Sequence, residues 1–250
     1  MNTPDTVLAS VAGTRLSLGS FLGWLHTQGR LEPLLREALA AQVVQQQARQ
    51  AGLTATAQEL QAAADSFRRR HGLHSAADTR AWLTARGLSE DDFEAGLEQD
   101  VLAAKLHSHL TAAGVDGHFA ADPAGFERLR LAQVVVGRED LARELATQIR
   151  EEGRELADVA REQGLHVLRV EGFRKELNGP LASALASAGA GQLVGPVGTP
   201  HGFALVLVEQ RHPAELDPAT RQRIQDELFA GWLAARLREA KSDLTLTGAS

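Results

Sequence analysis

Apolar side chains recur at helical spacing through most of the first 110 residues, and glycines interrupt them at short intervals. In one such stretch Leu60, Ala64 and Phe67 fall on a single helical face. Ser89 is followed three residues later by Asp92, which is typical of a capped helix start. The pattern predicts a short strand at 7–13 and helices at about 17–26, 33–51, 56–71, 75–86 and 89–110.

The helical spacing lapses between 111 and 125, where Gly114, Gly117, Pro123 and Gly125 form a turn-prone stretch. We interpret this stretch as a domain boundary. A strand pattern follows, since 129–136 ends in three consecutive valines. Further strands are predicted at 166–173, 192–197 and 203–209, and the last two are expected to form a hairpin. Helices are predicted at 138–152, 154–163, 180–188 and 217–240.

Charge and residue types exclude several function classes. The chain has 26 basic and 32 acidic residues, a formal net charge of -6, and no long basic run. Nucleic-acid binding is therefore not expected, because it needs a concentrated basic face. The chain has no cysteine, which removes disulfides and thiolate metal sites. The histidines are scattered without a HExxH motif, so we expect neither a metal nor another cofactor.

The first residues, MNTPDTV, have neither the basic start nor the apolar run of a signal peptide. No stretch approaches the roughly 20 apolar residues of a membrane span. We therefore expect a cytoplasmic protein that does not associate with a membrane.

The most specific motif lies at 191–203, which reads GQLVGPVGTPHGF. It resembles the GxxSxPVxTxxGxH string of the parvulin-type (PpiC-like) peptidylprolyl isomerases. Gly172 and Phe173 resemble the family's glycine-aromatic motif, and 131–136 resembles its first strand. The resemblance covers about 128–211. The flanking segments are similar to the amino-terminal domain of SurA-type chaperones, in which a final helix returns to complete the helical domain.

These resemblances imply an α+β fold. A helical, SurA-like domain is expected at 1–125 and would be completed by a carboxyl-terminal helix within 214–250. A parvulin-like (FKBP-like) domain with a mixed sheet is expected to be inserted at 126–213.

The chain departs from the parvulin pattern at the polar positions. The family's histidine on the first strand corresponds to Gln133, and the histidine of the last strand corresponds to Ala204. The family's acid or cysteine near the second helix has no equivalent. Thr199 matches the family's hydroxyl, and His201 lies in the turn, displaced from the usual histidine position. The catalytic residues are therefore unknown from the sequence.

The apolar seat for a proline ring is better matched. The resemblance implies a peptide-binding set of Gln133, Phe173, Leu177, Leu181, Thr199 and Phe203. Each has a plainer interpretation: the leucines and Phe203 as core residues, Gln133 as a partner of a backbone group, Thr199 and His201 as turn residues.

Two functions follow from the resemblance. The first is chaperone-like binding of unfolded or flexible peptide segments with weak or no prolyl isomerase activity. The alternative is an active peptidyl-prolyl cis-trans isomerase in which Thr199, His201 or Gln133 replaces the missing imidazoles. The expected partner is a peptide or an unfolded protein, and possibilities left open are a peptide-modifying enzyme and a homodimer with exchanged helices.

Overall fold

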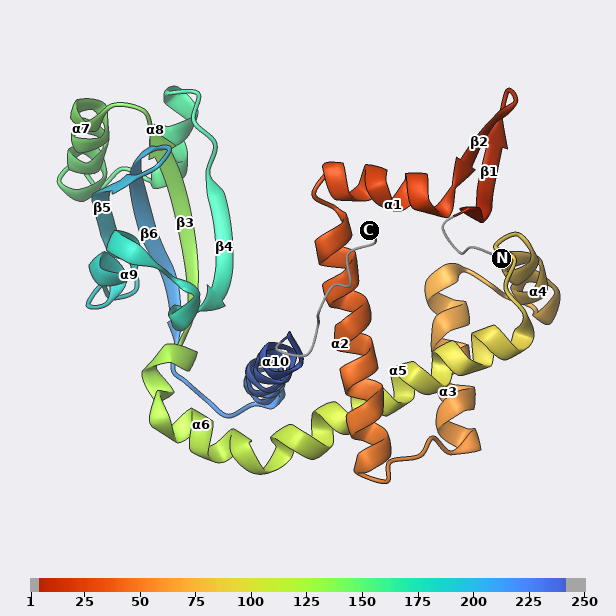
Figure 1. The fold of residues 1–250 in the computed structure, drawn as a ribbon. Helices are drawn as coiled ribbons and strands as arrows, with labels where there is room; N and C mark the ends of the chain where they lie inside the picture. The colour runs from red at the N-terminus through yellow and green to blue at the C-terminus, as the bar shows by residue number, and fades with distance from the viewer. Residues whose placement is uncertain (1–4, 242–250) are drawn as a thin grey trace. The chain divides into compact units, whose positions relative to one another are not determined.

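The computed structural model describes residues 5–241, and the chain divides into two compact units. One unit contains the described parts of 1–113 and 225–250, and the other contains Gly114–Ile224 (Figure 1). The inserted arrangement agrees with the α+β fold class expected from the sequence. The predicted boundaries at 125/126 and 213/214 stay predictions.

The first unit begins with a two-stranded antiparallel hairpin, where the sequence predicted one short strand. Ala12 and Gly13 both have positive φ, so the chain reverses there instead of extending through 13. The elements of this unit are β1 (Val7–Val11), β2 (Thr14–Ser17), α1 (Leu18–Thr27), α2 (Leu31–Gln50), α3 (Ala57–His71), α4 (Ala76–Thr84), α5 (Glu90–Thr111) and most of α10 (Pro218–Lys241).

Capping interactions fix where three of these helices begin. Ser89 accepts a hydrogen bond from the backbone N–H of Asp92, and the Asp92 carboxylate accepts one from the backbone of Ser89. Thr56 begins α3 and Ser75 begins α4 through the same reciprocal pair of bonds. These caps satisfy N–H groups that the helix itself leaves without partners, and they confirm the predicted helix starts.

The last helix docks on the first half of the chain. Val44 and Ala48 of α2 and Leu102 and Leu106 of α5 form a buried cluster. Three side chains of α10 pack against this cluster: Phe229, Trp232 and Leu233. His107 on α5 also lies 3.0 Å from Asp226 on α10. The expectation that the carboxyl-terminal helix completes the helical unit is confirmed. None of the helices within 5–241 combines the length and the apolar composition that a membrane span requires.

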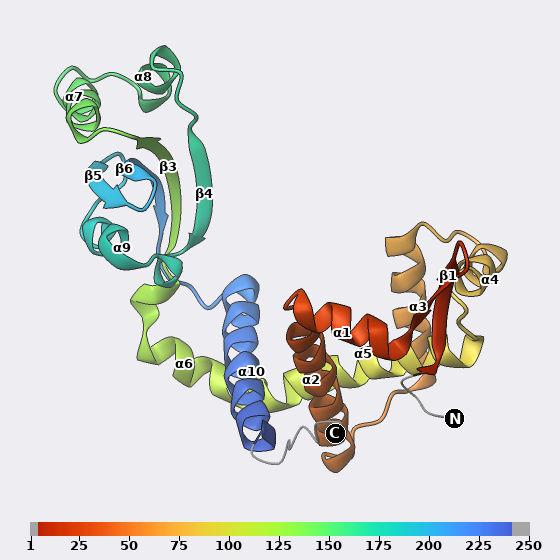
Figure 2. The ribbon, with the colours of Figure 1, turned by 45° about the horizontal axis from the view of Figure 1, so that its top comes forward.

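The second unit is built on a four-stranded sheet in the order β4-β3-β6-β5 (Figure 2). All its strand pairs are antiparallel, which corrects the expected mixed sheet. The two helices between β3 and β4 return the chain so that β4 runs against β3. The elements are α6 (Val115–Ala121), β3 (Arg128–Val136), α7 (Glu139–Arg150), α8 (Leu156–Glu162), β4 (Leu168–Phe173), α9 (Gly179–Leu185), β5 (Leu193–Thr199) and β6 (Gly202–His212).

The stretch at 111–125 is helical, although the sequence predicted an irregular linker. It continues from α5 through a short 3-10 turn into α6 and a second 3-10 turn. Val115 is buried, and His118 and Phe119 contact the ring of Phe126. Tertiary packing therefore overrides the weak helix propensity of the glycines here.

Each face of the sheet has its own apolar core. On one face, which we call the α7 face, Ala132, Val134, Val136 and Leu205 pack with residues of α7 and α8. On the other, which we call the α9 face, the sheet residues Leu129, Leu131, Ala204, Val206 and Val208 pack with Leu185 and Ala188. Outside the register shifts at Arg130/Leu131 and Val194/Val197, successive strand residues point to opposite faces, so the register assigns each of these side chains to one face.

Candidate functional site

Part of the α9 face remains uncovered, and its apolar side chains are exposed. Val135 is 36% exposed, Leu168 is 59% exposed and Val170 is 44% exposed. The strand pairs Val135–Ala204 and Val170–Leu131 place Val135 and Val170 on the α9 face. Leu168 pairs with Gln133, which in turn pairs with Val206 of the same face. We call Gln133, Val135, Leu168 and Val170 the open strip.

The segment after β4 supplies an apolar wall beside the open strip. Leu177 and Leu181 pack against the cluster that contains Ala204 and Val206. Leu185, at the end of α9, is 2% exposed in the same cluster. The half-buried leucines therefore stand on the α9 face, as a proline-ring seat would require, while Leu185 holds the helix to the sheet.

Arg211 connects the segment that carries this wall to the sheet. Nε of Arg211 on β6 donates to Oε1 of Glu127 at 2.7 Å, and a second guanidinium nitrogen donates to the other carboxylate oxygen. The same guanidinium donates to the carbonyl of Ala188, just after α9. Hydrogen bonds from Arg211 lower the pKa of Glu127 below its ordinary value. The segment is thus tied to the sheet at the end of the wall.

Gln133 and Ala204 lie on the same face as the wall, in the two positions where the resemblance implies histidines. Gln133 is half-buried, and its side-chain amide makes no hydrogen bond to any residue between 5 and 241. An amide of this kind offers both a donor and an acceptor to a bound peptide group. Ala204 is fully buried and carries no polar group. The face therefore has one polar side chain at these positions and no imidazole.

Thr199 and His201 lie in the β5–β6 turn. The Thr199 hydroxyl donates to the carbonyl of Gly202 at 2.9 Å and accepts from the backbone N–H of His201 at 3.3 Å. The His201 side chain is exposed. These contacts are those of a turn-bracing hydroxyl and a solvated turn residue, which was the plainer interpretation of both.

The two predicted phenylalanines lie apart from the wall. Phe203 pairs with Val136 and packs against the cluster on the α7 face. Phe173 ends β4, and its ring meets Phe126 edge-on, with centroids 6.0 Å apart. The structure therefore gathers Gln133, Leu177 and Leu181 on one face and places Phe203 on the other.

The exposed residues of the open strip were missed by reasoning from the sequence. Apolar Leu168 and Val170 alternate with charged Arg169 and Glu171, which is the signal of a strand with one apolar face. That signal was present, but alternation indicates which side chains share a face and does not indicate whether that face is covered.

The arrangement can bind an extended apolar segment without covalent chemistry. It combines an apolar floor, a leucine wall and one amide, and it needs no metal. Among the described residues, no group of three or more His, Asp or Glu side chains is arranged to hold a metal ion.

Comparison with known proteins gives one family match. Residues 119–221 match the model of the PPIC-type PPIASE domain. No curated protein matches the chain. Among solved structures, the chain is similar to the peptidylprolyl isomerase PrsA from Bacillus cereus, with 13% identity, coverage of 99% of this chain and 95% of that chain, and a TM-score of 0.45.

Two other solved structures show further likeness. A PpiC-type peptidyl-prolyl cis-trans isomerase domain is 22% identical over 38% of this chain and 99% of that chain, with a TM-score of 0.33. A structure from work on two SurA-like chaperones of Campylobacter jejuni is 11% identical over 96% of each chain, with a TM-score of 0.28. The family match covers the sheet, the wall and the open strip, and the part of the chain at 119–221 is therefore a PPIC-type peptidyl-prolyl isomerase domain.

Proposed function

We propose that the chain binds unfolded or flexible polypeptide segments in a chaperone-like way, and that its PPIC-type domain has weak or no prolyl isomerase activity. The observation that carries this proposal is the open strip beside the leucine wall. Val135, Leu168 and Val170 are the exposed large apolar side chains of this unit among the described residues, and all three lie on one face. Exposed apolar groups gathered in one place mark interaction surfaces.

The backbone of β4 supports the same proposal. β4 is an edge strand of the sheet, so one side of its backbone has no neighbouring strand in this sheet. An extended peptide can add to such an edge through main-chain hydrogen bonds, while its side chains fill apolar pockets on one face. A peptide bound here would place alternate side chains beside Leu168 and Val170 on the α9 face.

The polar set argues for low turnover. Rotation about a prolyl bond meets a barrier of about 18–20 kcal/mol, which an enzyme lowers by binding the twisted amide more tightly than the planar one. Polar groups aimed at the reacting amide supply much of that preference. Of the three positions where the family resemblance expects a polar side chain, only Gln133 offers a polar group to a peptide on the α9 face. Ala204 has no polar group, and the Thr199 hydroxyl is hydrogen-bonded within its turn.

Binding can be tested on the open strip itself. The probe is a fluorescein-labelled, end-capped hexapeptide with one central Ala-Pro bond flanked by leucines, titrated with the full chain. Replacing Leu168 and Val170 together by threonine gives both positions a β-branched residue that favours strands and removes apolar contact. We expect affinity to fall roughly tenfold, since each loses about 0.5–1 kcal/mol of apolar burial. The matched control is Glu171→Thr on the other face of β4, which should bind as the wild type does.

Turnover separates the proposal from the alternative of an active isomerase. Leu177→Ala combined with Leu181→Ala removes the wall. If the domain mainly binds, peptide affinity falls and an already negligible rate of proline isomerisation stays flat. If the domain is an active isomerase, the rate collapses in the double variant. Wild-type turnover similar to that of a typical parvulin would refute the loss of activity but leave binding at the open strip intact.

The identity of the client and its setting stay predictions. A peptide delivered to a modifying enzyme, a homodimer with exchanged helices and a cytoplasmic location were each inferred from the sequence. Light scattering over a wide concentration range tests the dimer, and a constant monomer mass removes it.

A further inference from the structure

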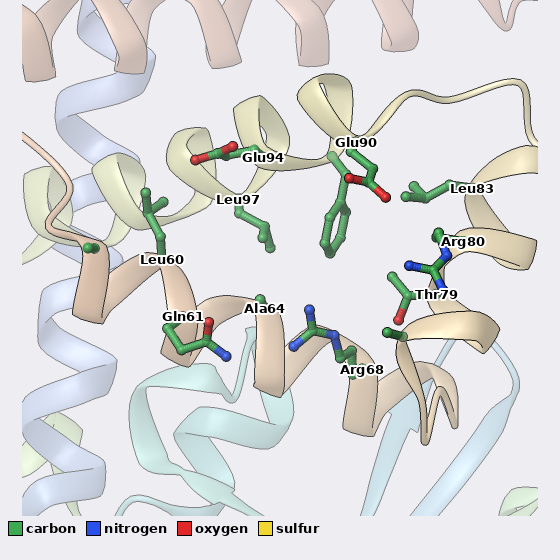
Figure 3. Close-up of a pocket in the computed structure, with 13 residues that line it drawn as sticks. Leu60, Gln61, Ala64, Arg68, Thr79, Arg80, Leu83, Glu90, Glu94 and Leu97 are labelled. Carbon is green, nitrogen blue, oxygen red and sulfur yellow. The ribbon is translucent and has the colours of Figure 1, made fainter.

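The helical unit contains a pocket of its own between α3, α4 and α5 (Figure 3). Its volume of about 410 Å³ falls in the range of ligand pockets. The apolar lining comes from all three helices, with Leu60 and Ala64 on α3, Leu83 on α4, and Phe93 and Leu97 on α5. The pocket lies wholly within this unit, so it is separate from the open strip.

An aromatic cluster stiffens one wall of this pocket. The ring of Phe67 meets the rings of Phe93 and Trp82 edge-on, with centroids 4.9 Å and 5.1 Å apart. The guanidinium of Arg86 covers the Trp82 ring at 3.9 Å from its centroid. Phe93 thus lines the pocket while its ring packs against Phe67 of the aromatic cluster.

Arg68 brings an unused donor to the pocket. Its Nε is buried. Among residues 5–241, no other buried side-chain nitrogen or oxygen lacks a hydrogen-bond partner. A terminal nitrogen of the same guanidinium binds the Asp65 carboxylate at 2.9 Å, and the other terminal nitrogen makes no hydrogen bond to any described residue. Figure 3 shows the guanidinium extending from α3 toward the middle of the pocket. Protein atoms close off Nε, but the Arg68 side chain as a whole is 34% exposed, so an acceptor on a ligand can bind the terminal nitrogens of this guanidinium.

The rim of the pocket carries both signs of charge. Arg68 and Arg80 contribute positive charge, and Glu90 and Glu94 contribute negative charge. A carboxylate amphiphile could pair with the arginines, but it would also face both glutamates. A peptide backbone carries a carbonyl for an arginine and an N–H for a glutamate, and it has no net charge to repel either. The rim therefore matches a polypeptide segment better than an anionic lipid.

We propose that this pocket is a second peptide-binding site, which takes one leucine- or phenylalanine-like side chain and holds the adjoining backbone carbonyl on the terminal nitrogens of the Arg68 guanidinium. The site needs no proline and uses none of the residues of the PPIC-type domain. A client segment with apolar residues well separated along its length could engage both sites at once, which raises overall affinity without any new contact.

The test uses the full chain labelled with ¹³C in its leucine methyl groups. The probe is an end-capped ten-residue Gly-Ser peptide with a single central leucine and no proline, and its serine counterpart is the blank. Methyl signals of Leu60, Leu83 and Leu97 should shift with the leucine peptide and not with the serine peptide, and these shifts should persist in the variant with Leu168 and Val170 replaced by threonine. Shifts confined to Leu177 and Leu181, or equal shifts with the serine peptide, would overturn the proposal without touching the function proposed for the PPIC-type domain.

Two pairs of variants decide the mode of binding. Ala76 lines the pocket from the first turn of α4, and Ala77 is its exposed neighbour outside the lining. Ala76→Trp should fill the pocket and weaken the leucine peptide at least tenfold, whereas Ala77→Trp should stay within twofold of the wild type. Arg68→Met should weaken binding about fivefold to tenfold through the lost hydrogen bond. Arg69→Met on the exposed neighbour is its control.

Each remaining outcome also has a meaning. Equal affinities of the two tryptophan variants for the leucine peptide would overturn the proposal. If Ala76→Trp does not fold, the affinities of Arg68→Met and Arg69→Met are compared instead, and equal values would overturn the proposal. Decanoate serves as the competing probe. If decanoate shifts the three pocket leucines and the peptide does not, the occupant is an anionic amphiphile and the peptide proposal fails.

Discussion

Leu185→Ala should destabilise the PPIC-type domain without destabilising the helical unit. Leu185 is 2% exposed and packs with Leu131, Val206 and Val208 on the α9 face. The change removes three carbon atoms from this cluster, a transfer loss of about 2.4 kcal/mol at about 0.8 kcal/mol each. A cavity adds to this loss, but α9 is a seven-residue helix at the surface and can settle partly into the space. We expect a loss of about 3 kcal/mol.

The distribution of tryptophan makes this prediction specific to one unit. The chain has three tryptophans, Trp24, Trp82 and Trp232, and all lie in the helical unit. Tryptophan fluorescence during urea unfolding therefore follows that unit alone. Hydrogen exchange of the β3 and β6 amides follows the sheet. Leu185→Ala should lower the exchange free energy of those amides by about 3 kcal/mol and leave the fluorescence midpoint unchanged.

Leu106→Ala provides the reciprocal control. Leu106 is 1% exposed in the cluster that joins α2, α5 and α10. Its truncation should move the fluorescence midpoint and leave sheet exchange as in the wild type. A loss below about 1 kcal/mol in Leu185→Ala would refute the packing estimate. If either variant changed the fluorescence midpoint and the sheet exchange free energy by equivalent amounts, the claim that the two units unfold separately would be wrong.

Two further predictions concern the β5–β6 turn and the response to acid. Gly202 has φ +129°, and an added Cβ would lie 2.5 Å from the carbonyl oxygen of Val136, so Gly202→Ala should cost about 2 kcal/mol or more in sheet stability measured by hydrogen exchange. The carboxylate of Glu59 binds Lys105 at 2.8 Å, and this contact, with the cap at Thr56, lowers the pKa of Glu59 from 4.5 to about 2. Its stabilising effect should be complete above pH 4.5 and fade as the pH falls toward 2, as followed by the fluorescence midpoint.

Each of these predictions has a control in the same element or unit. Gly198→Ala in the same hairpin should be nearly neutral, because an added Cβ there meets nothing within 4 Å. Glu59→Gln should flatten the fall in stability between pH 4.5 and 2, whereas Glu98→Gln at an exposed position on α5 should not. A steep fall that persists in Glu59→Gln would assign the acid response to other groups.

Local signals in the sequence were enough to predict most elements. Helix starts at Ser75 and Ser89 follow from side-chain oxygens that pair with nearby backbone N–H groups, and the structure confirms both. The two errors in the elements have different physical causes. The turn at Ala12 depends on positive φ in a non-glycine residue. The helix that includes Val115 depends on burial of that side chain by tertiary packing. Neither feature is visible in a local sequence pattern.

The site was predictable to the extent that strand alternation determines it. Once Ala204 is assigned to the α9 face, its neighbour Phe203 must face the other way, because the side-chain period of a strand is two residues. The family resemblance assigned Ala204 to a histidine position and Phe203 to the peptide-binding set, and alternation alone already places the two on opposite faces. The contact of Phe203 with the α7-face cluster follows from this rule.

The open strip could not be derived from any strand by itself. Leu168 and Val170 have the same alternating pattern as core residues of an edge strand, and their exposure depends on where α9 lies. Leu185 and the contact of Arg211 with Ala188 hold the segment carrying α9 over Val206 and Val208, toward β5 and away from β4. Coverage of the sheet is thus set by side chains far along the chain from β4. A variant that loosens this anchor should change the binding face even though it alters no residue of the open strip.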